Sequence, residues 1–188
     1  MWLGTDDYSY YMTRVVRSDD GGYEVGQEVD VEVSFDGLRV GSVGGLEDYG
    51  GPKGAYSEDW AEEDGALVYV SQSDVREQTE VVLEAHVFAP DRPSSYTDRG
   101  AAFTAMYSVY ASFMDYISGC YVMWRDTVRG RRVLMYLSEE SKPTVNSLED
   151  GSLTVKLTFQ NVYGRSFALD DMTVAGMLGI DSYPVYAG

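Results

Sequence analysis

The chain has little of the chemistry that enzymes use. Its 188 residues contain one histidine, His86, and one cysteine, Cys120. One cysteine excludes an internal disulfide framework, and a single histidine distant from it supports neither a Cys/His nucleophile pair nor a zinc site. The Gly-x-Ser-x-Gly element of serine hydrolases is also missing. We therefore expect no catalytic residue, no metal and no cofactor.

Long apolar runs are missing as well. No stretch approaches the roughly 18 apolar residues that a membrane span needs. The start of the chain, Met1 to Gly4 followed by acidic residues, lacks the basic and apolar regions of a signal peptide. We expect a protein that is made and used inside a cell, or in an assembly built there, without a membrane partner.

Basic residues are scarce, and the acidic excess is unevenly placed. The chain has 14 Lys and Arg against 31 Asp and Glu, a formal net charge of −17. Residues 19–98 alone carry 20 acids and 4 bases, a net charge of −16. Such a surface repels a phosphate backbone, so specific nucleic-acid binding is not expected. Solubility is the simplest explanation of the charge. The chain also has 16 tyrosines, a content that suits either β-strands or subunit interfaces.

Residues 98–118 carry the one strongly helical pattern. Apolar side chains recur there at steps of three and four: Phe103, Met106, Tyr107, Tyr110, Phe113, Met114 and Ile117. This spacing predicts an amphipathic helix. Ser95 and Asp98 fit a capped start, and Gly119 stands where a helix would end.

Most of the rest has the pattern of strands and turns. Alternation predicts half-buried strands at 29–36, 79–89 and 153–159, and a first strand at 8–17. Residues 121–137 have the signature of a hairpin. We predict one domain over residues 1–188, mainly β, a β-sandwich or split barrel with one packed helix at about 98–118. A long loop at 41–65 and extended N- and C-terminal arms complete it.

The 41–65 loop is rich in glycine, aromatic residues and acids. Its glycine spacing matches neither a P-loop nor a dinucleotide-binding turn, and its carboxylates would repel phosphate. The acidic part of the loop spans residues 58–64 and consists of Glu58, Asp59, Glu62, Glu63 and Asp64 together with the aromatic Trp60. A calcium site would suit this chemistry but lacks the order of an EF-hand loop, so a solvated or partner-facing segment is the preferred interpretation.

A basic cluster contrasts with this loop. Four of the eleven arginines lie within eight residues at the predicted hairpin tip: Arg125, Arg129, Arg131 and Arg132. They are compatible with a nucleic-acid patch, or with a contact to the acidic loop of a neighbouring copy. Two complementary patches on one chain make a head-to-tail contact that closes into a ring when the rotation permits. We prefer the subunit contact, because the rest of the chain repels DNA.

Five segments follow one another in a recognisable order: Phe35 to Val40, Lys53 to Trp60, His86 to Phe88, Tyr107 to Phe113 and Trp124 to Asp126. This order, over about residues 30–165, resembles distal tail proteins of long-tailed, siphovirus-like phages. It implies a fold related to the tail tube and a hexameric ring between the tube and the tip. It also implies tube and tip proteins as partners, and DNA that only passes through the channel. The protein would then belong to the virion tail and be assembled in the host cytoplasm.

Three other functions stay open. A tail-tube, tail-terminator or neck subunit would share the fold and the ring. A carbohydrate-binding β-sandwich would use Trp60, Tyr49 and Tyr56 to stack on sugars, with calcium on the 57–64 loop. An enzyme is disfavoured by the missing nucleophile and base.

Overall fold

The computed structural model describes residues 9–51, 56–59, 66–69, 76–90, 99–140 and 143–186. Side chains are described in 9–51, 76–90, 100–139 and 143–186. The strands are β1 Tyr10–Arg17, β2 Tyr23–Asp30, β3 Leu38–Gly44, β4 Tyr56–Asp59, β5 Ala66–Tyr69, β6 Thr79–Phe88, β7 Tyr121–Asp126, β8 Arg131–Glu140, β9 Thr144–Ser147, β10 Ser152–Asn161 and β11 Phe167–Ala168. The helices are α1 Val31–Ser34, α2 Arg99–Ile117 and α3 Thr173–Leu178.

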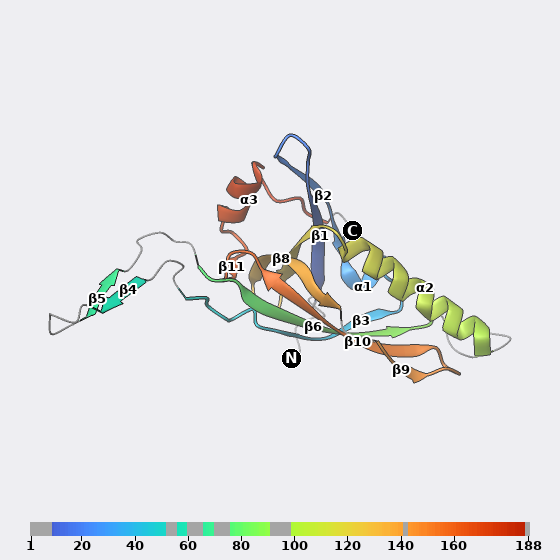
Figure 1. Cartoon of the computed structure of the whole chain (residues 1–188). Helices are drawn as coiled ribbons and strands as arrows, with labels where there is room; N and C mark the ends of the chain where they lie inside the picture. Colours follow the sequence, from blue (N-terminus) through green and yellow to red (C-terminus); the bar gives the residue numbers. More distant parts are fainter. Residues whose placement is uncertain are drawn as a thin grey trace, which may run out of the picture.

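Nine of the strands form one open antiparallel sheet (Figure 1). Its main path is β2-β1-β7-β8-β10-β6-β3, with β11 added to β8 and β9 added to β10. β4 and β5 form a separate two-stranded sheet. The predicted mainly-β fold with a helix packed against it is confirmed.

The sheet is covered on both faces. Figure 1 shows α2 lying along one side of the sheet, and α3 lies near β11. In β7, Val122 and Trp124 belong to the cluster that includes the buried side of α2. Met123, between them, belongs to a second cluster with Val174 and Leu178 of α3. Because successive side chains of a strand point to opposite faces, α2 and α3 cover opposite faces of the sheet.

The predicted helix is confirmed as α2, and most of its predicted apolar face is buried. Met106, Tyr110, Phe113, Met114 and Ile117 are buried in the larger cluster. Phe103 is partly buried, and Tyr107 is 51% exposed and stacks on Phe103 at 6.1 Å between ring centroids. Gly119 follows the helix with a φ of 68°, the left-handed conformation that ends many helices. The predicted cap at Ser95 and Asp98 lies outside the described residues.

The predicted strand at 29–36 is wrong beyond Asp30. The chain ends β2 there and forms α1 over Val31–Ser34. The Asp30 carboxylate accepts hydrogen bonds from the backbone N–H groups of Glu32 and Val33, both at 3.0 Å. This is N-capping, which competes with the extended conformation. As a result Val33, predicted to point inward, is 64% exposed.

The predicted strands at 79–89 and 153–159 are confirmed as β6 and β10, the longest pairing in the sheet. In β6 the side chains of Val81, Leu83, Ala85 and Val87 are buried, and His86 lies on the other face. β7 and β8 form the predicted hairpin. The one-domain organisation with extended terminal arms stays a prediction.

Candidate subunit interface

The β7–β8 hairpin carries all four clustered arginines. Arg125 and Arg132 pair directly across the hairpin, and Arg131 pairs with Asp126. Arg129 lies in the turn, beside Gly130, whose φ is 62°. Like charges directly opposite on antiparallel strands destabilise a sheet unless other groups compensate. The environment of each arginine therefore decides which of them is available to a partner.

Arg129 is bound within the chain at three points. Its Nη1 lies 2.7 Å from Oδ2 of Asp126, its Nη2 donates to the Val43 carbonyl at 2.9 Å, and its Nε lies 2.9 Å from Oε1 of Glu47. Asp126 is fully buried. The hydrogen bond to Asp126, more than any other contact, raises the pKa of Arg129. Arg129 thus fastens the hairpin turn to β3.

Arg125 forms a two-pronged ion pair with Glu28 of β2. Its Nε and Nη2 donate to the two carboxylate oxygens, both at 2.8 Å. Its guanidinium also lies over the Tyr11 ring, 3.9 Å from the centroid. The Glu28 carboxylate is nearly fully buried and also accepts from the backbone N–H of Tyr186 at 2.9 Å. Arg125 therefore binds groups of its own chain.

Arg132 is buried under the C-terminal part of the chain. It is 5% exposed, and its guanidinium lies 3.3 Å from the centroid of the Tyr183 ring. Burial lowers the pKa of Arg132, since the charged form loses hydration. Its Nε and Nη1 have no hydrogen-bond partner among the described residues. A partner protein cannot reach this group while Tyr183 covers it.

Arg131 is the member of the cluster best placed to meet another molecule. Its side chain is exposed at the start of β8, next to the turn. On its other side β8 pairs with β11, where Arg131 is opposite Ala168. The sequence grouped four arginines into one patch, and the structure leaves Arg131 exposed while holding the other three in contacts within the chain.

The acidic partner of this patch falls mostly outside the described residues. Glu58 and Asp59 lie in β4, opposite Leu67 and Ala66 of β5. The side chains of both, and the whole of Trp60, Glu62, Glu63 and Asp64, lie outside the described residues. The predicted contact between the basic and acidic segments stays a prediction, as does the calcium alternative on this loop.

The contacts of His86 are with side chains of the sheet, on β10 and on its own strand β6. Its Nδ1 is 3.0 Å from the Thr154 hydroxyl, and its Nε2 is 3.6 Å from a carboxylate oxygen of Glu84. Cys120, the only thiol, immediately precedes β7, which is separated from β6 by β8 and β10. Among the described residues, no group of three or more His, Cys, Asp or Glu side chains is placed to hold a metal. No described helix is long and apolar enough to span a membrane.

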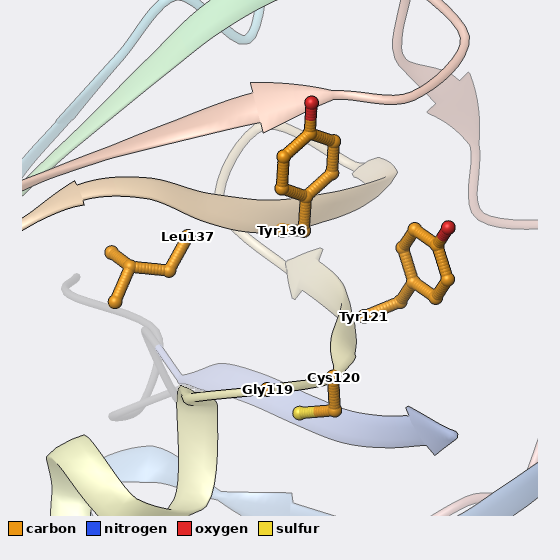
Figure 2. A pocket seen from close by; sticks show the side chains of 5 residues that line it. All are labelled: Gly119, Cys120, Tyr121, Tyr136 and Leu137. Carbon is orange, nitrogen blue, oxygen red and sulfur yellow. The ribbon is translucent and has the colours of Figure 1, made fainter. Parts of the chain in front are cut away.

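A hollow of about 320 Å³ lies where the chain passes from α2 into β7. Figure 2 shows the residues that line it: Gly119, Cys120, Tyr121, Tyr136 and Leu137. The Cys120 thiol donates to the Tyr116 carbonyl at 3.5 Å, and the Tyr121 and Tyr136 rings meet edge to face at 6.1 Å. The lining offers one half-buried thiol and no carboxylate or imidazole, so it lacks the paired groups that nucleophilic catalysis needs.

Comparison with known proteins finds several solved chains with a similar fold, and two of them come from a phage baseplate. No family model matches the chain, and no curated protein matches it. A chain from the baseplate of phage p2 in its activated conformation with Sr is 12% identical, with a TM-score of 0.45. The same baseplate with Ca gives 12% identity and a TM-score of 0.43. Each match covers 82% of this chain and 44% of the other, so this chain spans less than half the length of those it matches.

Proposed function

We propose that the chain is a structural subunit of a phage tail or baseplate, and that it joins copies of itself into a ring without catalysis. In detail, we place it at the distal end of the tail, between the tube and the tip. The two similar structures named above come from a phage baseplate, the kind of assembly in which this proposal places the chain.

The observation that carries the proposal is the open sheet. β2 and β3 end its main path on opposite sides, and each has one strand neighbour among the described residues. An edge strand presents backbone N–H and C=O groups that pair readily with a strand of another molecule. Two different edges on one subunit favour a head-to-tail contact, which closes into a ring when the rotation permits.

Charge supports the same kind of contact. Arg131 is exposed at the hairpin, while residues 19–98 carry a net charge of −16. Copies of such an acidic chain repel one another except where a base of one meets acids of the next. We propose that Arg131 meets the 58–64 segment of a neighbouring copy in a homo-hexameric ring, with tube and tip proteins above and below. Acidic groups along the channel would let DNA slide through without binding.

The test is a charge reversal at Arg131. Arg129 and Arg132 are unsuitable, because reversing them places a carboxylate beside buried Asp126 or under Tyr183 and would disturb the fold. We expect Arg131→Glu to weaken self-association by about tenfold or more, which corresponds to roughly 1.4 kcal/mol. Light scattering over a range of protein concentrations measures this change.

Arg17→Glu is the matched control, since Arg17 is an exposed arginine at the end of β1. It changes the net charge equally, so we expect it to leave association within about twofold of wild type. Replacing Glu62 and Glu63 with Lys should restore assembly of the Arg131→Glu chain. Equal assembly by the Arg131→Glu and wild-type chains would refute this contact.

A further inference from the structure

We propose that a pocket lined by two arginines binds a carboxylate carried on an apolar group. The pocket has a volume of about 310 Å³ and is lined by Arg76, Val162, Tyr163, Arg165, Phe167, Thr173 and Met177. It lies beside α3 and is separate from the hairpin arginines discussed above. This inference does not depend on the proposed ring.

Close backbone contacts bring the two arginines together from distant parts of the sequence. The N–H of Gly50 donates to the Gly164 carbonyl at 2.7 Å, and the N–H of Glu77 donates to the Gly51 carbonyl at 2.8 Å. A Cβ atom on Gly50 or on Gly164 would lie 1.9 Å from the Glu77 carbonyl oxygen. Only glycine permits this approach, so the segments around residues 50, 76 and 164 form one fixed wall.

Both guanidinium groups are oriented by Tyr49. Arg76 lies over the Tyr49 ring, 4.0 Å from its centroid, and donates to the Gly50 carbonyl at 3.2 Å. Arg165 donates to the Tyr49 hydroxyl at 3.4 Å, and its guanidinium lies 4.9 Å from the centroid of Phe167. Arginines held in this way lose little further side-chain freedom when they bind an anion.

The charge of the pocket is unusual for this chain. Two of only 14 basic residues line it, in a protein with a net charge of −17. The buried Nε of Arg76 has no hydrogen-bond partner among the described residues. Among the described residues, Glu77 follows Arg76 in the sequence, and Asp171 is close enough to Arg165 to feel its charge. The field of Arg165 contributes to the lowered pKa of Asp171, after the larger effect of the Thr173 hydrogen bonds.

The lining selects the class of ligand. A guanidinium presents paired N–H donors that match a carboxylate or a phosphate. The side chains of Val162, Phe167 and Met177 offer apolar contact, which favours an organic body on the anion. The acidic surroundings oppose the double charge of a phosphate more than the single charge of a carboxylate. A pocket of this volume holds an aromatic ring with a short acid chain.

Such a carboxylate has two sources, a free small acid or an acidic side chain next to an apolar one on a second copy of this chain. A probe and a mass measurement distinguish them. The probe is 3-phenylpropionate, and its neutral counterpart 3-phenylpropanamide has the same shape without the charge. Isothermal titration calorimetry on the full chain measures the binding of each.

We expect the acid to bind at least about tenfold more tightly than the amide, as a charge-assisted hydrogen bond contributes roughly 1.5–3 kcal/mol. Arg76→Gln and Arg165→Gln should each reduce binding of the acid by about tenfold or more. Arg17→Gln removes the same charge from an exposed site at the end of β1, outside the pocket, and should leave binding within about twofold. If a glutamine variant does not fold, Arg76→Lys and Arg165→Lys keep the charge without the paired donors and should still weaken binding.

The mass of the particle then identifies the source. A pocket variant that binds the acid weakly but self-associates as wild type indicates a free acid. A variant that also loses self-association indicates a carboxylate of a second copy. The proposal is overturned if the acid and the amide bind equally or not at all, or if the pocket variants bind the acid as tightly as wild type.

Discussion

Glu28 joins three parts of the chain that are distant in sequence. Its carboxylate binds Arg125, 97 residues away, and the backbone of Tyr186, 158 residues away. A nearly buried carboxylate with this number of partners stabilises the fold mainly because its loss would leave Arg125 uncompensated. Glu28 thus connects β2, β7 and the C-terminal part of the chain.

We expect Glu28→Gln to reduce the free energy of unfolding by about 3 kcal/mol, because it leaves a largely buried guanidinium without its counter-charge. Urea unfolding measures this change. Glu24→Gln is the control, since Glu24 is exposed on the same strand and should change stability by less than about 0.5 kcal/mol. Equal stability of the two variants would show that the ion pair contributes nothing to the fold.

The Asp171 carboxyl, just before α3, makes a pH-dependent contribution to the stability of the fold. Hydrogen bonds from the Thr173 hydroxyl and backbone N–H hold the pKa of Asp171 below its ordinary 3.8. Because the pKa of Asp171 is lower in the folded state, its ionised carboxylate stabilises the fold at pH values above the ordinary pKa. That contribution is lost as the pH falls through the lower, folded pKa.

Thr173→Val removes the hydroxyl donor, so we expect the pKa of Asp171 to rise toward its ordinary value. Carboxyl carbon shifts in an NMR titration measure this pKa. Thr104→Val is the control, because the Thr104 hydroxyl donates to the Gly100 carbonyl in α2 and has no contact with Asp171. An unchanged pKa in the Thr173→Val chain would contradict this explanation.

At the scale of the element, α2 shows that a residue can belong to a periodic apolar stripe without being buried. Phe113 and Tyr107 both belong to the predicted apolar stripe, but Phe113 is fully buried and Tyr107 is 51% exposed. Phe113 also meets Phe35 edge to face at 5.3 Å. The apolar stripe of α2 is wider than the part of the helix that packs against the sheet, so Tyr107, at the edge of the stripe, stays exposed to solvent.

We expect Phe113→Ala to reduce the free energy of unfolding by about 3–5 kcal/mol, through lost burial and the cavity left behind. Tyr107→Ala should cost less than about 1 kcal/mol, since only ring contacts with Phe103 and Tyr110 are lost. Thermal and urea unfolding of both variants measure the difference. Similar losses for the two would mean that α2 packs with a different face.

The sequence predicted the elements whose pattern is long and regular. α2, β6 and β10 have ten or more residues each, so their periodicity was clear. The strand predicted at 29–36 was wrong because one side chain, Asp30, caps a helix in the middle of an alternating pattern. α3 was missed because its six residues are too few to show a period.

The candidate sites were less predictable than the fold. Proximity in sequence grouped the hairpin arginines, but their partners Glu28, Val43 and Tyr183 lie far away along the chain. The pocket of Arg76 and Arg165 depends on backbone contacts at Gly50 and Gly164. Those glycines signal a close approach only once the structure shows what they approach.

At the scale of the whole molecule, two features bear on the proposed function: the open sheet and the uneven distribution of charge. The surfaces to which we assign the proposed contact are the two strand edges and the exposed Arg131, in a chain that is otherwise strongly acidic. Two different edges and complementary charges are compatible with the head-to-tail contact that we propose. The proposed ring follows from this arrangement.

The mass of the purified chain in solution, measured by light scattering as its concentration rises, tests this claim most directly. We predict particles of six copies of the 20.9 kDa chain, which dissociate as salt screens the contact between copies. A chain that keeps the mass of a single copy at every concentration, at low and high salt, would contradict the account.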